Sequence, residues 1–188
     1  QKMAPEQKMA PEQKIWNISN SKGLQNILRK QQVVLCYGHF NIIHPGHIRY
    51  LEHAKSLGKQ LVVLVQGDQM LTSSSNSHHF SAKERAMGLA WLHIVDFVLV
   101  LDKGELTDAI KLLRPNSLVL GKEFEKDPKD LQKEALKILR EVGAKVVYHA
   151  GDTQYATTDL LRDEQHMDLR SERWRQFHHA CQRQQLDL

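Results

Sequence analysis

Cysteine and long apolar runs are both scarce in this chain of 188 residues. The two cysteines, Cys36 and Cys181, stand far apart, which excludes the disulfide-dense framework of small secreted domains and favours a cytoplasmic localisation. No stretch approaches the ~20 apolar residues of a membrane span, and no signal-peptide pattern precedes the first expected strand. We therefore expect no membrane partner.

Charge of one sign is not concentrated anywhere either. The formal net charge is +4, and lysine and arginine form no block that would indicate a nucleic-acid-binding stripe. Hydrophobic residues make up 41% of the chain, a share typical of a globular protein with a buried core. This balance predicts no nucleic-acid partner and fits a site for small anionic molecules.

The first residues repeat themselves: the hexapeptide QKMAPE occurs twice in tandem over residues 1–12. It has no hydrophobic periodicity, and a repeat fold needs longer units and more copies. We therefore interpret residues 1–14 as a tag-like or disordered repeat and leave them out of the fold. One α/β domain is expected over residues 15–165, followed by a separate element over residues 166–188.

Continuous apolar runs alternate with amphipathic stretches from residue 32 onward. Five runs predict buried strands, at residues 33–37, 61–65, 96–101, 117–120 and 145–148. The stretches between them predict helices, at residues 47–57, 81–92, 106–113 and from the Asp127-Pro128 pair to Gly143. Residues 72–79 are polar and predict a loop. The alternation predicts a Rossmann-like α/β fold, a five-stranded parallel sheet with helices on both faces.

The end of the chain predicts a C-terminal helical extension. Trp174, Phe177 and Cys181 fall on one face of a helix over residues 171–182. That apolar face would suit packing against the domain or against a second copy, so we expect a homodimer. The alternative interpretation is the start of a further domain.

The strongest chemical signal follows the first predicted strand, in the segment GHFNIIHPGH at residues 38–47. Ligands of parallel sheets bind beyond the carboxyl ends of the strands. Gly38 allows close approach of a ligand to the backbone, and the free N–H groups of the helix that begins here attract an anion. His44 and His47 would flank that anion. The turn therefore predicts a phosphate site, suited to phosphoryl transfer, where catalysis is mainly positioning and charge neutralisation.

The same segment resembles the G-x-F-D-x-x-H-x-G-H signature of the cytidylyltransferase-like nucleotidyltransferases. Residues 83–87 and 95–98 are similar to the arginine-bearing helix and following strand of that family, and residues 156–161 to its late S-T-T helix start. The resemblance covers residues 33–162. Within the family it is greatest to the glycerol-3-phosphate cytidylyltransferases and to the nucleotidyltransferase domain of heptose-phosphate adenylyltransferases.

The resemblance implies a two-substrate reaction. CMP or AMP would pass from a nucleoside triphosphate, CTP or ATP with Mg²⁺, to a phosphorylated sugar, polyol or related small alcohol, and pyrophosphate would leave. The expected catalytic residues are His44, His47 and Lys122. The expected nucleotide-binding residues are Tyr37, Gly38, His39, Phe40, Asn41, Gly46, Arg85, Gly121, Thr157 and Thr158. The expected acceptor-binding residues are Gln66, Asp68, Glu123 and His149. No protein ligand to the metal is assigned.

Several positions depart from the family pattern. Asn41 stands where the family has Asp, the loop over residues 72–79 lacks lysines, and Gly151 stands where the glycerol-3-phosphate enzymes have Arg. These departures support a second hypothesis, a catalytically degenerate nucleotide-binding or regulatory domain of the same fold. They also leave the base and the acceptor open.

Some of these assignments have simpler structural alternatives. The His-x-x-His pair could be half of a zinc site completed by His39, His78 or His79, since zinc takes about four ligands. Arg85 could be a surface charge on its helix, and His149 could cap its strand instead of lining the acceptor pocket. Cys36 is expected to be a small core residue.

Overall fold

The computed structural model describes residues 9–70, 80–102, 106–122, 125 and 130–149. The chain divides into two compact units, residues 1–153 and 154–188, and all described residues belong to the first. The predicted loop over residues 72–79 and the predicted C-terminal helix over residues 171–182 lie outside the described part.

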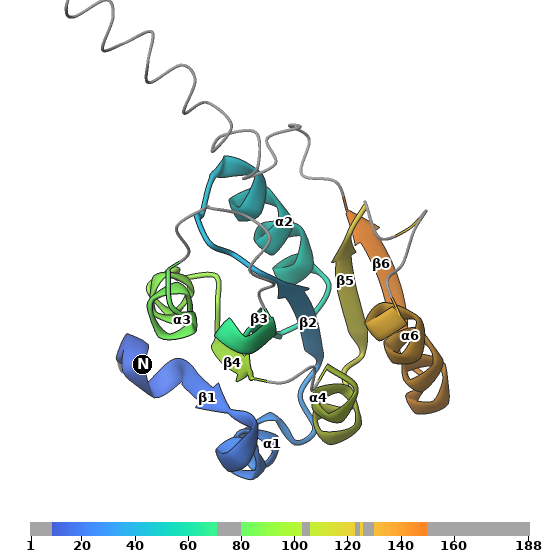
Figure 1. Ribbon diagram of the computed structural model, residues 1–188. Helices are drawn as coiled ribbons and strands as arrows, with labels where there is room; N and C mark the ends of the chain where they lie inside the picture. Colours follow the sequence, from blue (N-terminus) through green and yellow to red (C-terminus); the bar gives the residue numbers. More distant parts are fainter. Residues whose placement is uncertain (1–8, 71–79, 103–105, 123–124, 126–129, 150–188) are drawn as a thin grey trace, which may run out of the picture. The chain divides into compact units, whose positions relative to one another are not determined.

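A parallel sheet forms the centre of the described unit (Figure 1). Its strands are β1 (Ile15–Asn17), β2 (Val33–Gly38), β3 (Gln60–Gln66), β4 (Phe97–Leu101), β5 (Ser117–Gly121) and β6 (Lys145–His149). The helices are α1 (Ser21–Leu28), α2 (Pro45–Ser56), α3 (Ala82–Ala90), α4 (Leu106–Leu113) and α6 (Asp130–Val142), with short 3₁₀ turns at η1 (Pro11–Lys14), η2 (Ile18–Asn20) and η3 (Asp68–Met70).

The five predicted strands are confirmed within one or two residues, but the predicted strand number is wrong. The sheet has six strands, in the order β1-β4-β3-β2-β5-β6, because β1 adds to the edge of β4 with Ile15 opposite Val98. A three-residue strand is too short to show a period in the sequence. The helix α1 was missed as well: only Ser21, Leu24 and Leu28 of its residues are buried, and it contains a glycine.

That glycine has a packing reason. A Cβ on Gly23 would come within 2.8 Å of the Trp16 ring, so the helix can approach the ring only without a side chain there. The segment before it also joins the domain. The side chain of Lys14 donates a hydrogen bond to the Val95 carbonyl at 2.8 Å, although sequence analysis left residues 1–14 out of the fold.

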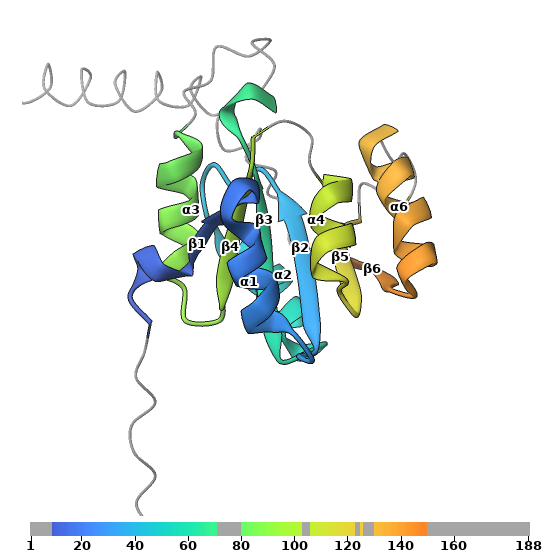
Figure 2. The same cartoon turned by 90° about the horizontal axis from the view of Figure 1, so that it is seen from below.

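Helices cover both faces of the sheet, as predicted. On one face, α2 and α3 pack against alternate residues of β2, β3 and β4. On the other, α1, α4 and α6 pack against the residues in between, and Figure 2 shows α1 and α4 in front of the sheet. Cys36 is fully buried in β2, as expected of a core residue, and burial raises the pKa of its thiol to about 12.

The strand order places the site. From β2 the chain proceeds outward to β3 and then β4, whereas β5 and β6 lie on the opposite side of β2. The order therefore reverses between β2 and β5, and their carboxyl ends, Gly38 and Gly121, border that crevice. Such a reversal is where doubly wound sheets bind ligands.

Candidate functional site

The turn between β2 and α2 is built around His44. This residue is the N-cap of α2, with an extended backbone, and its Nδ1 accepts a hydrogen bond from the Gly46 N–H at 3.1 Å. Because Nδ1 accepts, the proton of the neutral ring is on Nε2, which is left as a donor. Pro45 follows at the first helical position, where its lack of an N–H costs nothing. The sequence thus fixes both the start of the helix and the tautomer of the imidazole.

His47 lies one turn further along α2, and its ring lies 3.9 Å from that of His44 between centroids. Burial lowers the pKa of His47 to about 4, with the neighbouring His44 adding to the effect and the Ile42 backbone acting against it. Burial and then Arg49 lower the pKa of His44. Both rings are therefore neutral at pH 7, and His44 can offer its Nε2–H to an anion.

Phe40 packs against His47 and Tyr50 of α2. Its ring lies 5.2 Å from that of His47 and 6.4 Å from that of Tyr50 between centroids, and its backbone is left-handed with φ 53°. A left-handed conformation is costly for a bulky residue and often marks a functional turn. A Cβ on Gly38 would come within 2.9 Å of the Phe40 ring. The glycine that sequence analysis assigned to ligand approach is thus also needed for packing of this ring.

Arg85 on α3 joins the separate segments of the site. Its guanidinium is fully buried and donates three hydrogen bonds, to the His39 carbonyl (2.7 Å), the Phe80 carbonyl (2.8 Å) and Asp68 Oδ1 (3.0 Å). The interpretation of Arg85 as a surface charge is therefore wrong. In this structure the side chain holds the turn after β2 against the start of α3.

Asp68 and Asn41 add two more hydrogen bonds to this connection. Asp68 Oδ1 also accepts from the Ala82 N–H at 2.8 Å, and Asn41 Oδ1 accepts from the Phe80 N–H at 2.8 Å. The Asn side chain that replaces the family Asp thus ties the turn to α3. Phe80 is 55% exposed, although its backbone N–H and carbonyl are both hydrogen-bonded. It was not predicted as a site residue from the sequence. An aromatic residue beside a capping Ser was the available signal.

The other expected site residues that the structure describes lie at the same carboxyl end of the strands. Gln66 Nε2 donates to the Tyr37 hydroxyl at 3.0 Å, and Lys122 is exposed directly after β5. His149 ends β6 opposite Gly121 and stacks on His53 of α2, with centroids 4.2 Å apart. Glu123, Thr157 and Thr158 lie outside the described residues, so the S-T-T part of the site is not placed.

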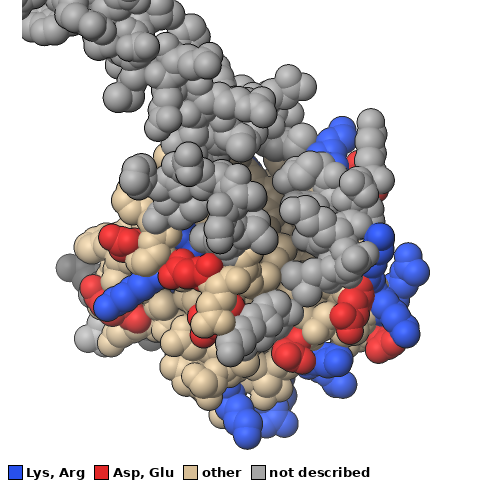
Figure 3. Space-filling view, viewed as in Figure 1, with Lys and Arg blue, Asp and Glu red and all other residues tan. Residues whose placement is uncertain are grey.

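A protein-held metal centre finds no support in the described residues, where no three His, Cys, Asp or Glu side chains gather at one point. His78 and His79, which would complete the zinc alternative, lie outside that part. On the face drawn in Figure 3, acidic and basic side chains are interspersed over the described surface, without a continuous basic stripe.

Comparison with known proteins decides the family. The profile described as "Cytidylyltransferase-like" matches residues 35–177, more than half of the chain, and spans the turn, both histidines and Arg85. The chain belongs to the cytidylyltransferase-like family. It is accordingly a nucleotidyltransferase by family, as the signature at residues 38–47 predicted.

Two groups of relatives illustrate the range of this cytidylyltransferase-like family. The chain is 36% identical over 112 residues to the bifunctional protein HldE of Campylobacter jejuni strain RM1221, covering 57% of this chain and 24% of that protein. It is 35% identical over 120 residues to an FAD synthase of Pyrococcus horikoshii, covering 63% of this chain and 78% of that protein. The chain thus spans about a quarter of the length of the HldE relative.

Solved structures agree on the fold. A lipopolysaccharide core biosynthesis protein from Thermoplasma volcanium shares 28% identity with a TM-score of 0.53, covering 67% of this chain and 99% of that one. A pantoate-beta-alanine ligase from Francisella tularensis has a TM-score of 0.51 at 16% identity over 72% of this chain and 66% of that one, a likeness of fold alone.

Among the described residues, no helix is long and apolar enough to cross a membrane.

Proposed function

We propose that this chain transfers a nucleotidyl group, CMP or AMP, from a nucleoside triphosphate to a phosphorylated sugar, polyol or related small alcohol. The observation that carries the proposal is the pair of neutral imidazoles at the N-terminus of α2, with ring centroids 3.9 Å apart, beside the reversal in strand order. The imidazole N–H groups and the positive end of the helix dipole there form a site that suits phosphate oxygens. The family match supports this reaction type.

The chemistry needs positioning more than acid–base catalysis. An oxygen of the acceptor phosphate forms a bond to the α-phosphorus, the bond from that phosphorus to the bridging oxygen breaks, and pyrophosphate leaves with the electron pair. A phosphate acceptor is already ionised at pH 7, so no general base is required. His44 and His47 would donate to the phosphate oxygens that gain charge in the transition state.

Two cations would add to this stabilisation. Lys122 is exposed at the end of β5, on the other side of the crevice from the histidines. Arg49 lies near enough to His44 to lower its pKa, and sequence analysis did not single it out. Nucleotidyltransferases of this family generally use a divalent metal. Since the described residues hold no acidic cluster, we assign Mg²⁺ to the triphosphate as part of the substrate.

Substitution of the histidines tests the proposal. His44→Ala and His47→Ala should each lower pyrophosphate release by about 10²–10³-fold, the usual effect of losing one transition-state donor. His93→Ala, an exposed histidine outside the site, is the control and should leave the rate unchanged. The assay measures pyrophosphate with each ribonucleoside triphosphate and Mg²⁺ against a panel of sugar phosphates, polyol phosphates and flavin acceptors. Full turnover in both alanine variants would refute the assigned roles.

A degenerate nucleotide-binding domain is the second candidate. It is favoured by Asn41, whose Oδ1 is bonded to the Phe80 N–H and which carries no charge. Calorimetry separates the two: nucleotide binding without pyrophosphate release across the whole acceptor panel would favour the degenerate domain. Release with any acceptor would exclude it.

A further inference from the structure

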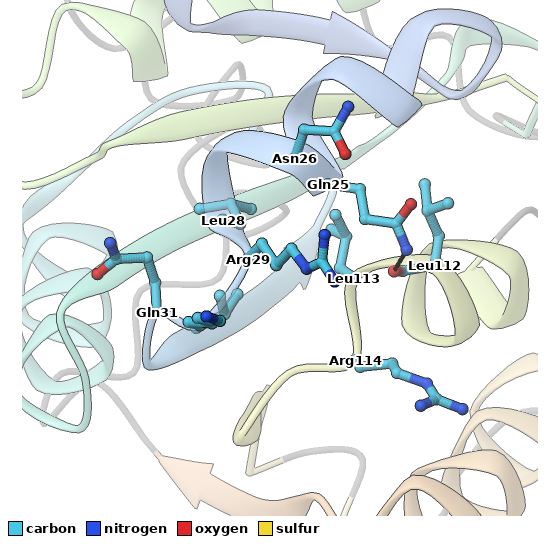
Figure 4. Close-up of a pocket in the computed structure, with 10 residues that line it drawn as sticks. Gln25, Asn26, Leu28, Arg29, Gln31, Leu112, Leu113 and Arg114 are labelled. Atoms are coloured by element: carbon cyan, nitrogen blue, oxygen red, sulfur yellow. Dashed lines mark hydrogen bonds between the residues drawn. The ribbon is translucent and has the colours of Figure 1, made fainter.

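A second hollow lies at the opposite end of the strands from the His44 turn, near the start of β2. Its volume is about 410 Å³, and it is bordered by the end of α1, the turn into β2 and the end of α4 (Figure 4). Val33 at the start of β2 is separated from Gly38 at its end by roughly 17 Å, at about 3.3 Å per residue. The hollow therefore has no part in the site already described.

Its charge is all of one sign. Arg29, Lys30 and Arg114 are the charged members of the lining, which contains no acidic residue. Within the described part of the chain, none of these three side chains makes an ion pair or hydrogen bond. Figure 4 shows Arg29 reaching from the end of α1 toward Leu113 on α4, while Arg114 points outward from the other rim. Three cations around one hollow favour an anion there.

The backbone places two of these cations at a cost. Lys30 has φ 67° and Arg114 has φ 44°, both in the left-handed region that glycine occupies freely. Each follows the end of a helix, where glycine is the usual residue. A basic side chain near a helix C-terminus is favourable by itself. That effect explains a cation at each corner, but not the hollow that both of them line.

The rest of the lining has the character of a small-molecule site. The buried apolar residues Leu28, Val33 and Leu113 form part of its wall, and the amides of Asn26 and Gln31 stand at its rim. The Gln25 amide already donates to the Leu112 carbonyl at 2.8 Å, which satisfies an acceptor in the last turn of α4. A volume of about 410 Å³ falls within the usual range of ligand pockets.

We propose that this hollow binds a small phosphorylated molecule, with its phosphate between Arg29, Lys30 and Arg114. Arginine guanidinium groups suit this task because they bind phosphate oxygens in pairs. Arg114 would turn inward on binding, a rotamer change that is common at binding sites. The ligand would lie against the start of β2, where Asn116 holds both backbone groups of Val33, with N···O distances of 2.9 and 2.8 Å.

The test uses inorganic pyrophosphate as the probe and the full chain carrying His44→Ala and His47→Ala. These two changes weaken binding of the probe at the His44 turn. Titration calorimetry at low salt should detect one pyrophosphate per chain. Adding Arg29→Gln and Arg114→Gln should weaken that binding at least tenfold. The matched control adds Lys22→Gln and Lys111→Gln, which remove the same charge from exposed positions of the same two helices outside the lining. The control should change affinity less than twofold.

Equal loss in both pairs would show a diffuse charge effect and overturn the proposal, as would no pyrophosphate binding in the histidine background. Circular dichroism confirms that each variant is folded, and the single variants Arg29→Gln and Lys30→Gln replace the pair if it is not. Because the assay needs no turnover, its result is independent of the nucleotidyl-transfer proposal.

Discussion

At the residue scale, the site depends on two imidazoles that are kept neutral. His47 is half-buried beside the His44 and Phe40 rings, and its pKa is lowered to about 4. His44 uses Nδ1 to cap its own helix, so the orientation of its ring is set by the first turn of α2. Neutral imidazole N–H groups can bind a polyphosphate without first taking up a proton. A bound anion would in turn raise the pKa of both rings.

The lowered pKa of His47 predicts a pH dependence of stability. The unfolded chain has an ordinary histidine pKa of about 6.5 and binds more protons than the folded chain between that value and about 4. The contribution of neutral His47 is therefore complete above pH 6.5 and is lost as the pH falls toward 4, by about 2 kcal/mol after allowance for partial exposure.

Urea unfolding of wild type and His47→Gln at pH 7.5, 5.5 and 4.5 measures this effect. The free energy of unfolding of wild type should fall more steeply with acidification than that of the variant. The exposed His93→Gln change should leave the wild-type slope in place. Parallel pH profiles for wild type and His47→Gln would contradict the assigned burial of a neutral ring.

Residue identities at the site were readable from the sequence, but their contacts were not. The signature at residues 38–47 located both histidines and the helix start, because it is local. The role of Arg85 depends on the His39 carbonyl, which is 46 positions away and has no sequence signal of its own. The same holds for Asn41, whose bond to Phe80 spans 39 positions.

At the scale of elements, the Arg85 side chain makes the largest number of hydrogen bonds between α3 and the segments around the turn after β2. The three hydrogen bonds of Arg85 need a planar fork, which lysine does not supply. We therefore expect Arg85→Lys to lower kcat by about 10–100-fold while KM for the triphosphate changes little, because a shift of about 1 Å in the turn is costly. Steady-state kinetics of pyrophosphate release would measure both constants.

Arg140→Lys on the exposed face of α6 is the control, and it should leave both constants at wild-type values. A rise in KM with unchanged kcat would instead show that Arg85 binds the substrate directly, as the family resemblance suggested.

Elements with a long run of apolar residues or with a capping motif were predicted well from the sequence. The capping box at Ser81 and Glu84 marks the start of α3, and the buried runs of β3 and β4 have no polar interruption. Short elements were missed for the opposite reason. A strand of three residues and a helix with three buried positions owe their form to tertiary packing more than to local preference. The strand packs on β4, and the helix packs on the face of the sheet that α4 and α6 also cover.

At the scale of the whole molecule, the choice of base remains the main question for the proposed reaction. A ligand present at 100 times its Kd stabilises the folded chain by roughly 2.7 kcal/mol, which corresponds to roughly 5–10 °C in Tm for a domain of this size. We expect either CTP or ATP, but not GTP or UTP, to give this shift with Mg²⁺. Thermal unfolding with the four ribonucleotides measures it, and equal shifts for all four would indicate that only the triphosphate is recognised.

The strand β1 also affects how readily the sheet could associate with another chain. The segment FVLVL of β4 is uncharged, wholly apolar and rich in β-branched residues, the composition of strands that self-associate when their edge is open. Three of its five residues are covered by Ile15, Trp16 and Asn17. A short, parallel edge strand that ends in a polar residue offers a poor template for another chain. The smallest strand of the sheet therefore covers an edge of β4 that would otherwise be open to pairing with another chain.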